Sequence, residues 1–356
     1  RDWSSDVCSS DLGQEPPKRA ALQRNVSCIR SQTLQTLHRI VVEHAIDSGV
    51  ESGTKVRTDT TPVAAPLRPP TDSALLGDAV RVLGRLLKKA QKQVPMSVPN
   101  HKRRVSYRTT ELRSPKLDPA YREALYFQLL QDTKDYIEAA LFAAEFLEGC
   151  DGAPAYSLSL KLRIQAENAL CIVDQTERRV LEHQEVPATD KRVSLFERHA
   201  DILTKRDQVV YGHKVCLTFG KTGVVLAAEI LRGNPADSTL AVPALLQVQA
   251  NTGKTPHDAA MDRGFSSKDN VVALKERGVQ RVSLSRGRGI DEEAACGNRR
   301  IRRKLHRFRA GAEGLISWLK RSLAMGQSRW KGEEGFWAYV WGVVMTASLQ
   351  AIAQAG

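Results

Sequence analysis

A change of hydrophobic pattern along the chain constrains the fold more than any other feature. Residues 74–184 follow helical periodicity and contain no convincing strand, with long helices predicted over about 119–148 and 157–184. Lys55–Thr60, ahead of this block, has the pattern of a strand that ends at an acidic residue. Prolines are then expected to end regular structure, at positions 62, 66, 69 and 70. A helical block therefore follows a first strand.

After the block, short strands alternate with helices. A hairpin is predicted around Gly220-Lys221-Thr222-Gly223, with strands over 209–219 and 224–231. Further elements are predicted in this order: a helix over about 238–249, a strand at 259–261, a helix over 267–277 and a strand over 279–284. A basic linker, a helix over about 312–323 and an apolar C-terminal helix complete the pattern.

The order of these elements favours an α/β fold. Without the helical block it matches an RNase H-like mixed sheet with flanking helices, interrupted by a large helical insertion after the first strand. Residues 1–12 resemble the translation of a sequencing-adapter oligonucleotide, so we expect a non-native segment joined to a protein entered partway through its gene. The expected divisions are 1–12, an N-terminal helical remnant at 13–54, a catalytic core at 55–73 and 185–334, the insertion at 74–184, and a C-terminal helix at 335–356.

The charge of the chain limits its partners. It holds 53 Lys and Arg against 40 Asp and Glu, which gives a net charge of +13. Such an excess favours a polyanion, nucleic acid first and an anionic membrane second, although a basic surface without a ligand is the alternative. The six cysteines are scattered without a C-x-x-C pair, which argues against a zinc ribbon or a disulfide framework and suits a reducing cytoplasm.

The apolar segment Gly335–Ala353 raises the question of a membrane span. It contains Thr346, Ser348 and Gln350, which favour a helix buried in a protein core. We therefore expect no membrane association, with a membrane-spanning helix as the alternative.

Three acidic residues are candidate metal ligands. Metal-assisted phosphodiester chemistry needs carboxylates that converge on a pair of hard cations. Asp59 and Asp262 are expected at strand ends and Glu313 on a late helix, from which their side chains can converge. Any one such residue is more often a turn or cap residue than a ligand, so the prediction depends on all three together.

The segments around these residues resemble the DDE transposases of bacterial insertion sequences, of the ISNCY-like and related groups. The resemblance runs from about residue 20 to the C-terminus and is carried by Val56–Val63, Pro70–Ser73, Tyr211–Val215, Gly233–Ser238, Met261–Phe265 and Phe308–Lys320. It implies cleavage of DNA at element ends and strand transfer into target DNA, with Asp59, Asp262 and Glu313 as catalytic residues and ligands of two Mg²⁺ or Mn²⁺ ions. It also implies a homodimer in the synaptic complex, acting in the bacterial cytoplasm at the nucleoid.

The spacing R-x3-E-x6-K is the most specific part of the resemblance. Positions 309 and 313 are separated by about 400° on a helix and 309 and 320 by about 1100°, so Arg309, Glu313 and Lys320 share one face. The cations suit DNA phosphates, whereas a solvated charged stripe is the common alternative. His306 stands where this signature usually has a tyrosine; it can still contact phosphate.

Basic residues surround this motif. The run Arg299–Arg309 is dense enough to follow DNA phosphates, and we assign DNA contacts to Arg302, Arg303 and Lys304 with Arg309, Lys320 and His306. Phe308 is expected to pack within the protein. A second cluster, His101-Lys102-Arg103-Arg104, lies in the helical block.

Three other acidic residues are left out of the metal set. Asp72 is expected to cap a helix, Asp237 to occupy a turn, and Asp258 to lie at the far end of its strand from Asp262. Two other functions stay open: a metal-dependent nuclease of the same fold without strand transfer, and a non-catalytic DNA-binding relic.

Overall fold

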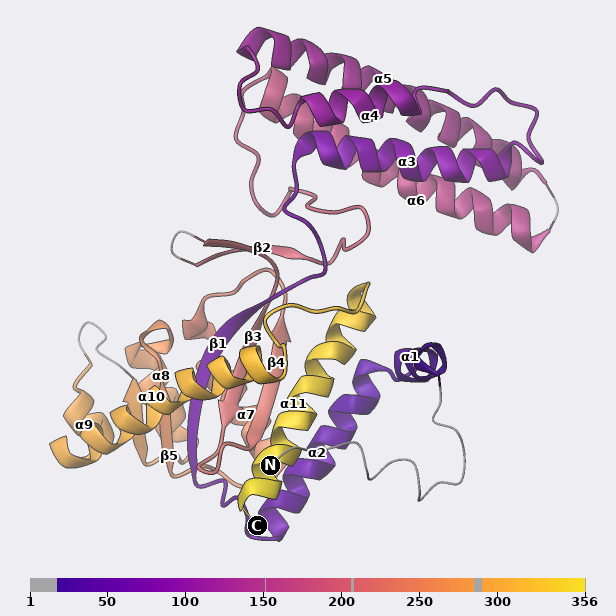
Figure 1. Ribbon diagram of the computed structural model, residues 1–356. Coiled ribbons are helices and arrows are strands. Elements are labelled where there is room, and N and C mark those ends of the chain that lie inside the picture. Colours follow the sequence, from indigo (N-terminus) through magenta and orange to yellow (C-terminus); the bar gives the residue numbers. More distant parts are fainter. Residues whose placement is uncertain (1–17, 151, 206–207, 285–289, 356) are drawn as a thin grey trace. The chain divides into compact units, whose positions relative to one another are not determined.

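The computed structural model describes residues 18–150, 152–205, 208–284 and 290–355 (Figure 1). The expected adapter-derived segment 1–12 lies outside the described residues. The chain forms two compact units. We call Arg1–Val63, Lys214–Leu231 and Pro235–Gly356 the sheet unit, and Ala64–His213 with Arg232–Asn234 the helical unit.

The strands form one mixed sheet. They are β1 (Lys55–Ala64), β2 (Asp201–Lys205), β3 (Gln208–Phe219), β4 (Val225–Leu231), β5 (Asp258–Met261) and β6 (Arg281–Leu284). Their order is β2-β3-β1-β5-β6, and β4 also pairs with β3. β1, β5 and β6 run parallel, whereas β3 is antiparallel to β2 and β4. The predicted RNase H-like fold is confirmed, and β2 is a strand that the sequence pattern did not indicate.

β1 differs from its prediction in length. It continues through Pro62 to Ala64, where the sequence indicated an end at Thr60. Its pairing with β5 stops at Thr58, so the missing N–H of Pro62 removes no ladder hydrogen bond on that side. Asp59 therefore follows the part of β1 that pairs with β5, and it does not end the strand.

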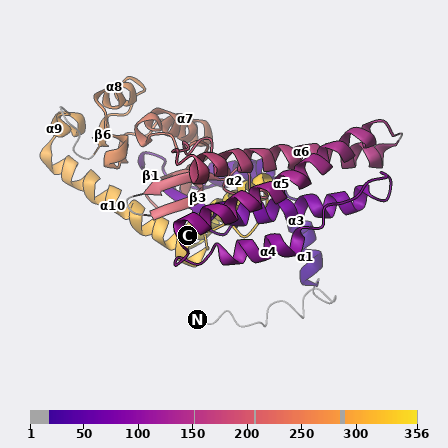
Figure 2. The same cartoon turned by 90° about the horizontal axis from the view of Figure 1, so that it is seen from above.

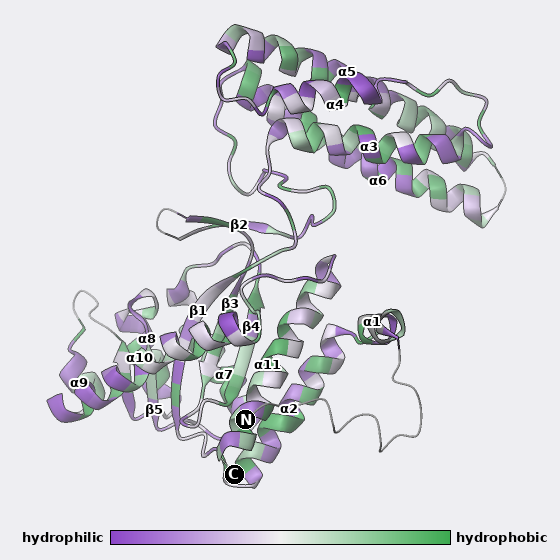
Figure 3. Ribbon diagram, viewed as in Figure 1, coloured by the Kyte–Doolittle hydropathy of each residue, from purple (hydrophilic) through white to green (hydrophobic). Residues whose placement is uncertain are grey.

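The sheet unit also contains α-helices. They are α1 (Arg19–Ser27), α2 (Ser31–Asp47), α7 (Ala241–Thr252), α8 (Lys268–Glu276), α9 (Glu292–Cys296), α10 (Arg299–Ser322) and α11 (Glu333–Ala355). α10 corrects one prediction, because the supposed basic linker is its first half (Figure 3). Arg and Lys are good helix formers, and the Asn298 side chain caps the helix by accepting from Ile301 N at 2.9 Å.

α11 is the one helix in the described residues that is long and apolar enough to cross a membrane. It lies beside α2 and packs against β4 (Figure 1). The buried His38 ring of α2 contacts Val225 O of β4 at 2.8 Å and Ser348 Oγ of α11 at 3.3 Å. These polar contacts at its centre fit a core helix of a folded unit.

The helical unit contains α3 (Asp72–Ala90), α4 (Lys102–Glu111), α5 (Pro119–Glu148) and α6 (Ala153–Thr176), which continues as a π-helix over Glu177–Leu181. α3, α5 and α6 pack against one another, and α4 packs on α3 and α5 (Figure 2). Their shared core includes the fully buried leucines 76, 83, 87, 129 and 162. The expected cap at Asp72 is wrong: Thr71 Oγ1 accepts from Ala74 N, and Asp72 pairs with Arg179 at 2.9 Å.

α10 packs against β5 and β6, and a side chain of β1 also reaches it. Arg57 of β1 donates from Nη1 to the carbonyl oxygen of Phe308 at 3.0 Å, and its guanidinium lies 4.6 Å from the centroid of the Phe308 ring. This contact confirms that Phe308 packs within the protein. A Cβ at Gly311, one turn further along α10, would overlap Arg57 Nη1. The absence of a side chain at Gly311 therefore leaves room for the Arg57 guanidinium against α10.

Two glycines of α10 give a matched test of this approach. Gly314→Ala meets open space and should stabilise the protein by about 1 kcal/mol through helix propensity. Gly311→Ala gains the same propensity but must displace Arg57 from Phe308, so its free energy of unfolding should be at least about 1 kcal/mol below that of Gly314→Ala. Urea unfolding measures both, and equal stabilisation by the two changes would contradict a tight contact of Arg57 with α10 at Gly311.

His38 should make stability depend on pH. Burial lowers its pKa from 6.5 to about 4. The unfolded chain takes up this proton near its ordinary pKa and the folded chain does so only near the lowered one, so stability should fall as pH drops through that window. The expected loss is roughly 2 kcal/mol between about pH 7 and about pH 5.

The measurement is the difference in urea unfolding free energy between the two pH values. His38→Gln should lose this part of the pH dependence, whatever its own effect on stability. His44→Gln, at an exposed position of the same helix, is the control and should keep it. An unchanged pH dependence in His38→Gln would show that other groups cause it.

Candidate active site

Strand register sets Asp59 beside Asp262. β1 and β5 pair in parallel from Lys55 with Asp258 to Thr58 with Met261. The next residues are Asp59 and Asp262, and Asp262 keeps an extended backbone. Neighbouring strands lie about 4.8 Å apart, so the two acidic residues occupy adjacent positions where the strands separate. Asp59 shares its strand face with Arg57, which contacts α10.

Arg309 connects Asp262 to Glu313. Its Nη1 atom lies 2.9 Å from Asp262 Oδ1 and 3.6 Å from Glu313 Oε1. The two carboxylates are therefore separated by no more than the sum of these distances. The Arg309 side chain is only 13% exposed, whereas that of Glu313 is 70% exposed. The structure thus brings together the three residues proposed from the sequence. Strand register puts Asp59 beside Asp262, and the Arg309 guanidinium links Asp262 to Glu313.

The donor set suits a hard divalent cation. Asp59, Asp262 and Glu313 offer carboxylate oxygens, the ligands that Mg²⁺ and Mn²⁺ favour. A guanidinium already lies between two of these carboxylates, which shows that this position attracts positive charge. Asp262 and Glu313 are accessible to solvent, so ions and a phosphodiester can reach them. These residues fit the implied metal ions.

The acidic residues excluded on sequence grounds have other contacts. Asp237 accepts from Lys214 Nζ at 3.0 Å and from Thr60 Oγ1 at 3.2 Å. Thr60 follows Asp59 in β1, so it points to the opposite face of the sheet. Asp258 begins β5, at the other end from Asp262, and contacts His257 at 2.6 Å.

The proposed DNA-contacting residues lie on α10 in different surroundings. Arg303, Lys304 and His306 are exposed. Arg302 pairs with Glu292 of α9 at 3.2 Å, a partner that sequence reasoning missed. Lys320 is half-buried, two turns after Glu313. Arg309 is held by carboxylates, which the sequence pattern did not indicate, although its spacing from Glu313 put the pair on one face.

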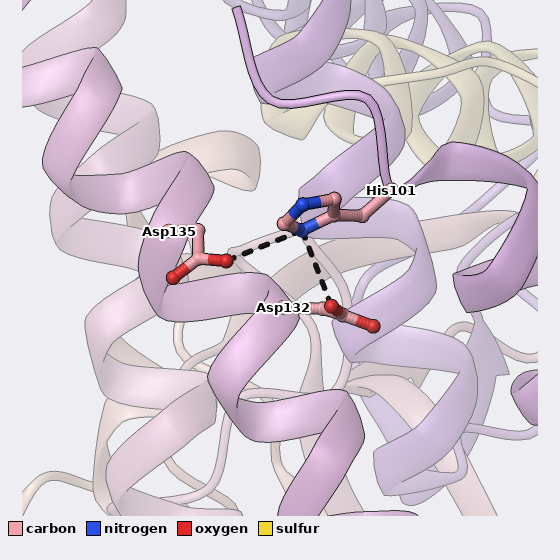
Figure 4. Close-up of side chains that lie close together, drawn as sticks. All are labelled: His101, Asp132 and Asp135. Carbon is pink, nitrogen blue, oxygen red and sulfur yellow. Dashed lines mark ion pairs between the residues drawn. The ribbon is translucent and has the colours of Figure 1, made fainter.

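A second acidic cluster lies in the helical unit. His101 Nδ1 lies 3.2 Å from both Asp132 and Asp135, and Figure 4 shows the ring between these carboxylates. The three ligand atoms lie close enough to hold a metal ion. However, the buried Asp132 carboxylate also pairs with Arg104 and Arg108. Two guanidinium groups would repel a divalent ion, so the cluster is better suited to joining α4 to α5.

A chain of buried hydrogen bonds joins the segment before β2 to β3. Glu197 contacts His199 Nε2 at 3.0 Å, His199 Nδ1 contacts His213 Nε2 at 2.9 Å, and Asp201 contacts His213 Nδ1 at 3.1 Å. The ring centroids are 5.1 Å apart, near the largest value that this N···N distance allows, so the rings meet edge to edge. At 2.9 Å the inner nitrogens are too close for a metal ion to bridge them head-on, because each bond to zinc needs about 2.0 Å.

Comparison with known proteins supplies the family. No curated protein and no solved structure matches the chain significantly. The family model described as the transposase DDE domain matches residues 166–349, which include Asp262 and Glu313 but not Asp59. Because this match covers more than half of the chain, the protein belongs to the transposase DDE domain family.

Proposed function

We propose that this chain is the catalytic core of an insertion-sequence transposase that cleaves DNA at element ends and joins the freed 3′-hydroxyl to target DNA. Membership of the family already implies a DNA-acting enzyme of transposition. The finer proposal is supported chiefly by one observation: Arg309 spans Asp262 and Glu313, while register sets Asp59 beside Asp262. Three carboxylates, from two strands and a helix, can then face one phosphodiester.

Asp59, Asp262 and Glu313 would hold two Mg²⁺ or Mn²⁺ ions, which when bound activate the attacking oxygen and stabilise the leaving one. The chain contributes the alignment of these carboxylates, because β1, β5 and α10 fix their backbones. The basic side chains of the protein would bind the DNA substrate. Lys320, His306 and the exposed residues of the basic run would contact DNA phosphates on either side of the cleaved bond.

The remaining parts of the proposal follow from this role. Joining two element ends needs two active sites, so we propose a homodimer in the synaptic complex, acting on DNA in the bacterial cytoplasm. A nuclease of the same fold would cut DNA without joining the ends, and a relic would bind DNA without cutting it. Incubating the chain with plasmid DNA, element ends and Mn²⁺ separates the three by their products.

Two residues on α10 separate metal binding from DNA binding. Glu313→Gln should abolish cleavage at every DNA concentration, because a neutral amide neither holds the ion nor balances its charge. Lys320→Ala should weaken DNA binding and lower its salt dependence by about one counterion, while Mn²⁺ binding persists. Circular dichroism checks that both variants fold. Cleavage by Glu313→Gln would move the third carboxylate elsewhere, and equal loss of Mn²⁺ binding would remove the distinction.

Arg309 should compete with metal ions for the carboxylates. Its guanidinium contacts both Asp262 and Glu313, so Arg309→Gln removes a positive charge from the ligands. Allowing for screening at these exposed carboxylates, we expect Mn²⁺ to bind about tenfold more tightly to the variant. Titration calorimetry without DNA measures this, and Arg302→Gln, on the same helix and paired with Glu292, is the control. Weaker Mn²⁺ binding in Arg309→Gln would mean that the arginine orients the ligands.

A further inference from the structure

A cavity lies at the starts of the parallel strands, away from the carboxylates. Its volume is about 420 Å³. Lys55, Asp258 and Arg281 begin β1, β5 and β6 and are directly paired in register. The other wall is the start of α10, with Asn298, Arg300 and Lys304. Since Asp59 and Asp262 follow the other ends of the same strands, the cavity is separate from the candidate active site.

The lining of this cavity is strongly basic. Four cationic side chains face it, from Lys55, Arg281, Arg300 and Lys304, against the single carboxylate of Asp258. That carboxylate is shared, because it contacts His257 Nδ1 at 2.6 Å and Arg281 Nη1 at 3.7 Å. The cations therefore exceed the negative charge in the cavity wall, and an anionic ligand would relieve their mutual repulsion.

The pKa of Lys55 reflects this crowding of positive charge. Burial lowers its pKa, Asp258 raises it, and neighbouring cations lower it further: Lys304, Lys221 and Arg281. The start of α10 adds partial positive charge, because the peptide dipoles of a 24-residue helix are aligned there. A cavity of this volume is within the range of small-molecule ligand sites.

We propose that this cavity binds a backbone phosphate of the DNA strand whose end lies at the carboxylates. The proposal rests on the proposed function, which supplies the DNA. Lys304 and Arg300 precede Glu313 by nine and thirteen residues of one helix, or about 14 and 20 Å. Phosphates of one strand advance about 3.4 Å per nucleotide along the duplex axis. The bound phosphate should therefore lie about four to six nucleotides from the reacting end.

The test is a scan of neutral linkages. Duplexes with a free 3′-hydroxyl end carry one methylphosphonate at successive positions, and binding of the full chain is measured in EDTA. For the unmodified protein, a neutral linkage about four to six nucleotides from the end should weaken binding by about tenfold and lower the salt dependence by about one counterion. In Arg300→Ala the same linkage should have no further effect, because the contact is already lost.

Arg307→Ala is the matched control, an exposed arginine of the same helix outside the cavity. It should keep the full response to the neutral linkage. Equal responses in Arg300→Ala and the unmodified protein, or an equal effect of every linkage, would overturn the proposal. The basic helix would then bind DNA phosphates without a preferred position.

The source of the phosphate is tested separately. If the cavity takes a small free anion, inorganic phosphate or a mononucleotide will bind in an Arg300-dependent way while the linkage scan shows no preferred position, which overturns the DNA proposal. The readout needs no cleavage, so failure of the carboxylate assignment leaves it interpretable. A chain that binds no DNA at any salt concentration would overturn both this proposal and the proposed function.

Discussion

The close approach of α10 to the sheet is the constraint on which the candidate site depends. Glu313 can share a cation with Asp262 only because Arg309 of the same helix reaches the end of β5. α10 packs on β5 and β6, while the Arg57 side chain of β1 reaches the Phe308 carbonyl and Gly311 leaves room for its guanidinium. A bulkier residue at Gly311 would meet the Arg57 guanidinium.

The docking of α10 brings different parts of its charge pattern to different parts of the sheet. The first half of the helix carries the basic run and forms one wall of the cavity at the starts of the parallel strands. Its middle carries Arg309 and Glu313 at the ends of the paired segments of β1 and β5. One helix thus runs past both the starts and the ends of the parallel strands. A DNA strand that follows the helix would meet cations before and beside the carboxylates.

The helical unit has its own hydrophobic core and its own buried polar contacts. Asp132 is almost completely buried, its charge is compensated by Arg104 and Arg108, and His101 also contacts it. A buried charge of this kind is tolerated only when it is paired, which explains why basic residues lie on α4 opposite it. The basic cluster at 101–104 therefore has a structural task within the unit, at least for Arg104 and His101.

Local pattern determined a large part of this protein. The sequence located α5, the β3–β4 hairpin and the short strands β5 and β6, because each is marked by helical spacing or by a short apolar or β-branched run. It failed where neighbours override local preference: β1 passes through Pro62 because its β5 side is unpaired there, and a supposed linker is helical because Asn298 caps it. The sequence also put Arg309, Glu313 and Lys320 on one helical face. Only the tertiary structure decided that Arg309 pairs with Asp262, that Asp59 stands beside Asp262, and that three strand starts enclose a basic cavity with α10. Those contacts join residues far apart in the chain, and no local periodicity encodes the register or helix docking that brings them together.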